Sequence, residues 1–242
     1  IDDMVVFVPG AIPGDVVDLQ VTRKRKKYRE AKVTRYISYS EKRTDPFCSH
    51  FGTCGGCKWQ HLPYSEQLKY KEKQVLDALQ RIGKIDIDRV DPILGAEKTR
   101  FYRNKLEYTF SNHRWLSDEE AAGDRVFENR NGVGFHVPGR FDRVVDVQKC
   151  YLQEDPSNLV RDTLREFALE HELSFYDHKT NEGLMRNVII RTTTTGEVMV
   201  VLSVQFDEPV IYEMLEDLSS RVEGITSLMY VINPKKNETL YD

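Results

Sequence analysis

Residues 184–204 have the sequence LMRNVIIRTTTTGEVMVVLSV, and this stretch decides the fold class. Two runs rich in valine and isoleucine flank four consecutive threonines and a glycine. Branched side chains suit the pleated surface of a sheet, and a Thr/Gly connection suits a short turn between neighbouring strands. The stretch therefore predicts a β-hairpin.

The segments around this hairpin alternate between strand and helix patterns. A helix is predicted from Ser157 to about Leu173, ahead of the hairpin, and another near residues 208–221 behind it. Residues 117–131 are polar and rich in charge, which predicts a surface connection. Further strands are predicted in residues 102–111, 132–138, 143–150 and 225–232. Together these elements predict a mixed α+β unit.

The first part of the chain has short strand patterns separated by Gly/Pro turns. Branched apolar residues recur in residues 4–8, 16–23 and 31–38, and the turn PGAIPGD separates the first two runs. Such a pattern is typical of a small or incomplete β-barrel.

One longer helix is predicted further along, over residues 63–83. Leu68, Val75, Leu76 and Leu79 form an apolar stripe at helical spacing. Ser65 is the predicted N-cap and Gly83 the predicted C-cap. The stripe predicts a packing face.

The composition restricts the class of protein. The chain has 242 residues, of which 40% are hydrophobic and 31% are charged, and its net charge is −4. This balance is that of a soluble globular protein. No apolar run approaches the roughly 20 residues that cross a bilayer, and the sequence does not open on a secretion signal. We therefore expect a cytoplasmic monomer without a membrane partner.

A basic segment contrasts with this acidic balance. Residues 22–36, TRKRKKYREAKVTRY, carry eight lysines and arginines against one glutamate, a local net charge of +7. A patch of this kind is a candidate contact for a polyanion. The alternative is a solvated strand edge whose lysines guard against aggregation. The sequence alone leaves both interpretations open.

Three of the four cysteines lie close together. Cys48, Cys54 and Cys57 fall within CSHFGTCGGC, and Cys150 follows after 92 intervening residues. In a cytoplasmic protein of this size, clustered cysteines indicate metal ligands or redox thiols before disulfides. Iron–sulfur clusters use a three-plus-one spacing, whereas structural zinc sites usually supply a second close pair. An iron–sulfur site, a zinc site and redox thiols all stay open on spacing alone. Nearby histidines that could serve zinc are His50 and His61.

Several long motifs resemble the RNA uracil-5-methyltransferases. FVPGAIPGDVV and VTRKRKKYREAKV are similar to the TRAM domain, a small OB-like barrel with an RNA-binding function. The cysteine loop and the helix after it are similar to the segment that follows TRAM in these enzymes. YRNKLEYTFS, GFHVPGRFDRVVDVQKC and LMRNVIIRT are similar to their central domain. The resemblance covers nearly the whole chain.

The resemblance implies a cofactor and its ligands. In the family members that act on 23S ribosomal RNA, four cysteines in this order bind a [4Fe–4S] cluster. The resemblance therefore implies cluster ligands at Cys48, Cys54, Cys57 and Cys150. It also implies 23S ribosomal RNA as the partner.

Candidate RNA contacts come from the basic segment and from the strand predicted at residues 102–111. Lysines and arginines would neutralise phosphates, and Tyr28 could stack on an unpaired base. In the strand, alternation places Arg103, Lys105 and Glu107 on one face. The candidate RNA-binding residues are Lys24, Arg25, Lys26, Lys27, Tyr28, Arg29, Lys32, Arg103, Lys105 and Glu107.

The expected fold class is α+β, with the C-terminal Rossmann-like methyltransferase domain absent. It comprises a partial OB-like TRAM β-barrel, an iron–sulfur loop, a helix and a mixed α/β central domain. The expected segments are an N-terminally incomplete TRAM barrel at residues 1–42, the cysteine loop at 43–59, a helical segment that packs on the methyltransferase domain at 60–99, and the central domain with the fourth ligand at 100–242.

These features predict part of an S-adenosylmethionine-dependent 23S rRNA (uracil-5-)-methyltransferase. The part is expected to bind RNA and the cluster and to present a flipped uracil to the catalytic domain. It is expected to have no catalytic residue, to be inactive by itself and to leave S-adenosylmethionine to the absent domain. The alternatives are a stand-alone RNA-binding module with a structural zinc or iron–sulfur site, and a zinc-dependent interaction protein.

Overall fold

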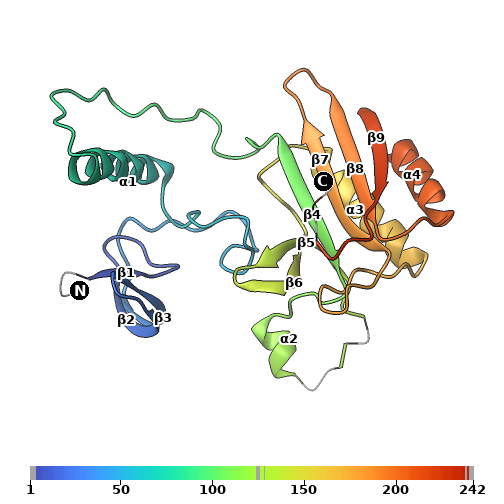
Figure 1. The fold of residues 1–242 in the computed structure, drawn as a ribbon, viewed down its shortest axis with the longest axis horizontal. Coiled ribbons are helices and arrows are strands. Elements are labelled where there is room, and N and C mark those ends of the chain that lie inside the picture. Colours follow the sequence, from blue (N-terminus) through green and yellow to red (C-terminus); the bar gives the residue numbers. More distant parts are fainter. Residues whose placement is uncertain (1–3, 124–125, 128, 238, 240–242) are drawn as a thin grey trace. The chain divides into compact units, whose positions relative to one another are not determined.

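Figure 1 shows the fold as a computed structural model, which describes residues 4–123, 126–127, 129–237 and 239. The chain forms two compact units. Unit 1 comprises Ile1–Gly52 and Cys57–Glu97, and unit 2 comprises Thr53–Gly56 and Lys98–Asp242. Within the predicted connection at 117–131, residues 124, 125 and 128 lie outside the described residues.

Unit 1 begins with a three-stranded sheet. The strands are β1 (Val5–Phe7), β2 (Val16–Lys24) and β3 (Tyr28–Ser38), in the order β1-β3-β2. β2 and β3 form an antiparallel hairpin, whereas β1 runs parallel to β3. The predicted strands are therefore present, but among the described residues they form an open sheet with a parallel edge rather than a barrel.

Asp15 and Arg43 tie the turn after β1 to the segment after β3. The Asp15 carboxylate accepts hydrogen bonds from the backbone N–H of Ile12 (2.7 Å) and of Ser40 (2.9 Å). It also accepts from Arg43 Nε at 2.9 Å and Nη2 at 2.6 Å. The carboxylate side chain is only 1% exposed. The Arg43 guanidinium is the main cause that holds the pKa of Asp15 well below its usual range, so this carboxylate stays charged in the folded protein.

The predicted helix of unit 1 is α1 (Tyr64–Asp77), and it continues as a π-helical turn, η1 (Ala78–Ile82). Its N-cap is Pro63, which has no side-chain oxygen to cap the helix, so the prediction of Ser65 as N-cap is wrong. The end is as predicted: Gly83 follows η1, where a Cβ atom would lie 2.7 Å from the Leu79 carbonyl oxygen. Glycine is required there because any larger residue would clash with that oxygen.

Unit 2 is built on a six-stranded sheet in the order β6-β5-β4-β7-β8-β9. All neighbouring pairs are antiparallel except β8 and β9, which run parallel. The predicted hairpin is β7–β8, with Thr193 N–H donating to the Glu197 carbonyl across the turn. The strands are β4 (Lys105–Ser111), β5 (Gly132–Val137), β6 (Arg140–Asp146), β7 (Met185–Thr192), β8 (Val198–Val204) and β9 (Ile225–Ile232).

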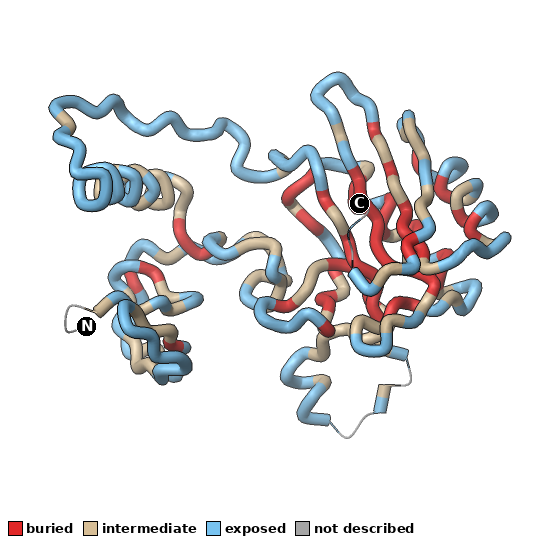
Figure 2. Tube along the Cα trace, in the orientation of Figure 1, coloured by how far each residue is buried: buried red, intermediate tan, exposed pale blue. Residues whose placement is uncertain are grey.

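Two helices of unit 2 pack beside each other, α3 (Ser157–Glu170) and α4 (Val210–Arg221). Leu164 of α3 and Met214 of α4 are fully buried. The α4 helix links β8 to β9, as a parallel pair requires. Figure 2 shows buried residues concentrated along the strands of this unit and the inner sides of its helices. This apolar core fixes the loops between strands and helices, and the cysteine and polar groups described below lie on such loops.

Two local features were not predicted. A short helix, α2 (Asp118–Ala122), lies inside the predicted connection and is closed by a capping box between Ser117 and Glu120. Gly134 allows β5 and β6 to approach closely, since a Cβ atom there would lie 2.1 Å from the Val145 carbonyl oxygen. Among the described residues, no helix is both long and apolar enough to cross a bilayer.

Candidate RNA interface and cysteine site

The basic segment forms the tip of the β2–β3 hairpin. Arg25 N–H donates to the Tyr28 carbonyl at 2.9 Å and closes a turn of three residues. Arg23 and Arg35 pair with Glu30 and Asp18 on the neighbouring strands, at 3.7 and 2.8 Å. The other cations have no carboxylate partner among the residues that the structure describes, and their charge faces solvent or, for Arg29, is half-buried. They are Lys24, Arg25, Lys26, Lys27, Arg29 and Lys32.

Tyr28 is held by an aromatic neighbour. Its ring packs edge-on against Phe7 of β1, with the ring centroids 5.4 Å apart. Phe7 is itself exposed, so the two rings form an apolar patch at the base of the charged turn. An exposed aromatic edge among free cations has the composition of a single-strand RNA contact.

Of the three candidate RNA contacts Arg103, Lys105 and Glu107, the structure places two on strand β4 and one before it. Lys105 and Glu107 lie on β4, opposite in direction to buried Leu106 and Tyr108, as the alternation predicted. Lys105 Nζ lies 3.4 Å from the Glu107 carboxylate. Arg103 precedes β4, and its side chain is exposed.

One partner of Glu107 comes from a distant strand, so no local sequence pattern reveals it. Asn187 on β7 donates its amide to Glu107 Oε1 at 2.7 Å. Asn187 is buried, and its Oδ1 has no hydrogen-bond partner among the described residues. The Glu107 carboxylate is thus fixed by a cation on its own strand and an amide on the next.

In unit 1, Cys48 and Cys57 lie on either side in sequence of the unit 2 segment Thr53–Gly56. Cys48 N–H donates to Gln60 Oε1 at 3.2 Å, and its carbonyl accepts from Phe51 N–H at 3.1 Å. Neither thiol is in a disulfide. His61 is buried against the Phe51 ring, 5.0 Å between centroids. Burial, followed by the positive charge of Arg43, lowers the pKa of His61, which makes it a neutral core residue at pH 7.

In unit 2, Thr53–Gly56 place Cys54 against β5. Gly55 N–H donates to the His136 carbonyl at 3.1 Å, and a Cβ atom on Gly55 would lie 2.5 Å from that oxygen. Gly56 N–H donates to Cys54 Sγ at 3.4 Å. A Cβ atom on Gly56 would be in contact distance of Leu152, two residues after Cys150. Gly55 therefore allows a close approach to β5 that a larger residue would block, whereas Gly56 lies in ordinary contact with its neighbours.

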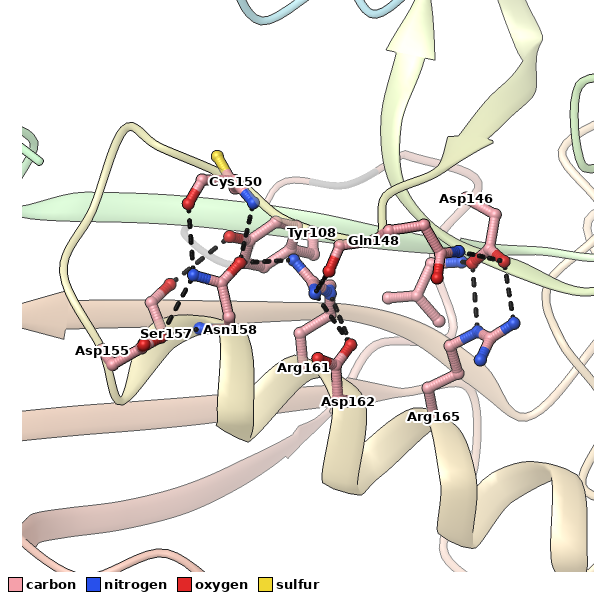
Figure 3. A network of polar contacts seen from close by, with 11 residues as sticks. Tyr108, Asp146, Gln148, Cys150, Asp155, Ser157, Asn158, Arg161, Asp162 and Arg165 are labelled. Atoms are coloured by element: carbon pink, nitrogen blue, oxygen red, sulfur yellow. Dashed lines mark hydrogen bonds and ion pairs between the residues drawn. The ribbon is translucent and has the colours of Figure 1, made fainter. Parts of the chain in front are cut away.

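Cys150 is buried in the loop between β6 and α3, and Figure 3 shows the polar network around it. Asn158 of α3 hydrogen-bonds both backbone groups of Cys150, and the buried Arg161 contacts Asn158 in turn. Burial, followed by the charge of a Cys150 thiolate, raises the pKa of the neighbouring Tyr108. Sequence reasoning missed Asn158 and Arg161, since nothing in a helical Asn-x-x-Arg spacing reveals what the helix faces.

The donor set fits an iron–sulfur cluster in its chemistry. Four thiols are the ligands that a [4Fe–4S] cluster takes, and the Gly55–Gly56 approach supplies a backbone N–H directed at sulfur. Within the residues that the structure describes, no three or more His, Cys, Asp or Glu side chains form a group that could hold a metal ion.

Comparisons with known proteins relate this chain to RNA methyltransferases. No family model matches the chain. It is similar along its whole length to proteins named as uncharacterized RNA methyltransferases. One from Bacteroides thetaiotaomicron is 50% identical over 100% of this chain and 54% of the relative. One from Porphyromonas gingivalis is 48% identical over 100% of this chain and 53% of the relative. The chain thus spans about half the length of the curated relatives it matches.

A solved structure has a similar fold. It is the Pyrococcus abyssi tRNA (uracil-54, C5)-methyltransferase in complex with S-adenosyl-L-homocysteine. The TM-score is 0.64 and the sequence identity 24%, over 98% of this chain and 49% of that chain.

This likeness corrects the predicted fold class. The sequence predicts a fragment defined by the absence of a C-terminal Rossmann-like domain. The solved structure instead matches 98% of this chain, so the fold is described by the elements it contains, and its definition by an absent domain is wrong. In unit 1 the described strands of the expected partial barrel form a three-stranded sheet, and in unit 2 the expected mixed α+β part has a largely antiparallel sheet. The prediction that this chain is inactive has no support in either comparison.

Proposed function

We propose that this chain binds RNA as part of an S-adenosylmethionine-dependent (uracil-5-)-methyltransferase that acts on 23S ribosomal RNA. The observation that carries the proposal is the β2–β3 hairpin, which carries six cations without carboxylate partners among the described residues, together with the Tyr28–Phe7 ring pair. The names of the relatives support methyl transfer to RNA as the reaction class. So does the name of the solved structure, which contains S-adenosyl-L-homocysteine, the molecule left when S-adenosylmethionine has given up its methyl group. Lysine and arginine contacts of this kind bind the phosphate backbone and position the RNA, without reading its sequence.

The reaction explains why such a surface is needed. A methyl group reaches C5 of a uracil only after the base has left its stack, which costs a few kcal/mol. S-adenosylmethionine would supply the methyl group. The hairpin cations would hold the backbone on one side of the flipped nucleotide, and Lys105 with the fixed Glu107 carboxylate could contact the flanking bases.

The test is a map of 5-methyluracil in RNA from a strain that lacks the gene for this protein. We expect one or more 5-methyluracils of 23S ribosomal RNA to disappear, and to return when the gene is restored. The likeness to a tRNA enzyme makes tRNA the second candidate substrate, so the same map includes the tRNA pool. Loss from tRNA alone would contradict the ribosomal substrate, and an unchanged map of both RNAs would contradict the reaction class.

We also propose that Cys48, Cys54, Cys57 and Cys150 hold a [4Fe–4S] cluster. The support is the thiol donor set, the close approach at Gly55 and the Gly56 N–H donated to Cys54 Sγ. Transfer of a methyl group from S-adenosylmethionine to uracil is polar chemistry, so the role of the cluster is to stabilise the cysteine segments.

Replacing Cys150 with serine should then remove the cluster. Protein purified without oxygen is expected to contain about four irons and four sulfides per chain with a broad visible absorbance, and the Cys150→Ser variant to contain little of either. Iron, sulfide and zinc are measured on the same samples. Stoichiometric zinc in the unsubstituted protein, with no sulfide, would overturn the cluster and support the structural zinc alternative.

A further inference from the structure

The side-chain amide of Asn158 forms hydrogen bonds with both the N–H and the carbonyl of Cys150. Its Oδ1 accepts from Cys150 N–H at 2.8 Å, and its Nδ2 donates to the Cys150 carbonyl at 3.1 Å. The same Nδ2 donates to Asp155 Oδ1 at 3.1 Å, which also accepts from Asn158 N–H at 3.2 Å. The partners of the Asn158 amide therefore define which of its atoms is the oxygen and which is the nitrogen. The same bonds hold Cys150 next to the first turn of α3 (Figure 3).

Arg161, one turn further along α3, holds Asn158 and the segment before Cys150. Its Nη1 donates to Asn158 Oδ1 at 2.9 Å, and its Nη2 donates to the Gln148 carbonyl at 2.8 Å. The guanidinium also lies 5.3 Å from the Tyr108 ring centroid. Arg161 is fully buried. It thus holds the Gln148 carbonyl directly and the backbone of Cys150 through Asn158.

The charge of Arg161 is only partly balanced inside the protein. Its ion-pair partner Asp162 lies at 2.8 Å, but the Asp162 side chain is 43% exposed, so water screens it. Burying a cation costs several kcal/mol unless an anion in the same low-dielectric region compensates it. The buried positive charge next to Cys150 therefore favours an anionic group at that cysteine.

We propose that Asn158 and Arg161 are positioning residues for Cys150 as a cluster ligand. Asn158 fixes the backbone of Cys150. Arg161 fixes Asn158 and supplies a positive charge that offsets the negative charge of a thiolate-ligated cluster. This inference rests on the cluster proposed above. Hydrogen bonds around ligands and nearby charge set how firmly a cluster is held and at what potential it is reduced. The two residues therefore act on different measurable quantities.

The test compares variants of α3 in the whole chain, reconstituted with iron and sulfide without oxygen. Asn158→Ala should lose its iron to a chelator about ten times faster than the unsubstituted protein. Removing a hydrogen-bond partner of a metal ligand typically lowers metal affinity by about 10- to 100-fold. Arg161→Gln should shift the reduction potential of the cluster to more negative values, because removal of a cation disfavours the added electron. Arg161→Lys keeps the positive charge, so its reduction potential should stay close to that of the unsubstituted protein.

The matched control is Arg165→Gln. Arg165 lies four residues further along the same helix and pairs with Asp146 at 2.8 Å, so this change also removes a paired arginine from α3 without a contact to Cys150 or Asn158. We expect iron retention and potential to stay as in the unsubstituted protein. Circular dichroism is recorded for every variant to confirm folding.

A second variant covers the case in which Asn158→Ala does not fold. Asn158→Asp keeps the acceptor for Cys150 N–H and Arg161, but loses the donor to the Cys150 carbonyl, so it should fold and still release iron faster. Iron retention and potential equal to those of Arg165→Gln in Asn158→Ala, Asn158→Asp and Arg161→Gln would overturn the positioning role. Folded, unsubstituted protein that takes up no iron would instead overturn the cluster itself, so the two failures are distinguishable.

Discussion

Changing Lys24, Lys26 and Lys27 to glutamine is expected to weaken the binding of a short unstructured RNA on the order of 100-fold at about 0.1 M salt. For single strands, each phosphate contact adds about 0.7 to the slope of log affinity against log salt, which is about fivefold per contact between 1 M and 0.1 M salt. Three contacts therefore account for the expected loss, and the slope should fall by about 2. Binding is measured by fluorescence anisotropy across a salt series.

A matched control separates the hairpin from net charge. Lys69, Lys71 and Lys73 lie on exposed positions of α1, and glutamine at all three removes the same charge from the same unit. Lys69 and Lys73 already pair with Glu66 and Asp77, so they have less charge to offer to RNA. We expect less than a threefold change. Equal losses from both triple variants would mean that the hairpin has no special role, and no loss from either would remove it from the interface.

Replacing Asp15 with asparagine should destabilise unit 1 by about 3 kcal/mol at pH 7, because it leaves the Arg43 guanidinium half-buried without its counter-ion. The pKa of Asp15 is depressed in the folded protein, so its contribution is complete above the unfolded value of about 4 and is lost as the pH falls below it. The unsubstituted protein should therefore lose stability below about pH 4 more steeply than Asp15→Asn does.

The two tryptophans allow unit 1 to be observed separately. Trp59 lies in unit 1 and Trp115 in unit 2, so a Trp115→Phe background leaves one fluorescent reporter for unit 1. Urea unfolding is followed at several pH values. Asp18→Asn is the control: Asp18 pairs with Arg35, but both side chains are exposed, and such pairs contribute about 1 kcal/mol or less. If the two variants were equally stable, Asp15 would not be the tie between the two segments of unit 1.

Local sequence signals predicted much of unit 2. The β7–β8 hairpin follows from its branched runs and Thr/Gly turn, and β9 has the predicted bounds because its neighbours are turns and a helix end. The same kind of signal was present but overlooked in α2, where Ser117 and Glu120 have the spacing of a capping box. An acidic, low-hydrophobicity stretch suggested a loop, and the cap outweighed that composition.

Features that depend on distant partners could not be predicted. The three-residue β1 pairs parallel to β3, and no local pattern specifies which strand a short run will join. The helix start at Pro63 instead of Ser65 follows from the geometry of the preceding loop. At the candidate site, the sequence marked the charged residues but not their organisers. Asn187 and Asn158 acquire their roles only when β7 and α3 are placed beside β4 and Cys150.

The four residues Thr53–Gly56 have a consequence for any attempt to dissect this protein. They belong to unit 2, while the chain on both sides of them belongs to unit 1, so the polypeptide passes between the units three times. No single cut separates the units: a truncated protein of residues 98–242 would leave the His136 carbonyl without the Gly55 amide, and residues 1–97 would carry that amide without its acceptor. Evolutionary exchange of either unit by simple recombination is hindered for the same reason, which ties the inheritance of the cysteine loop to both.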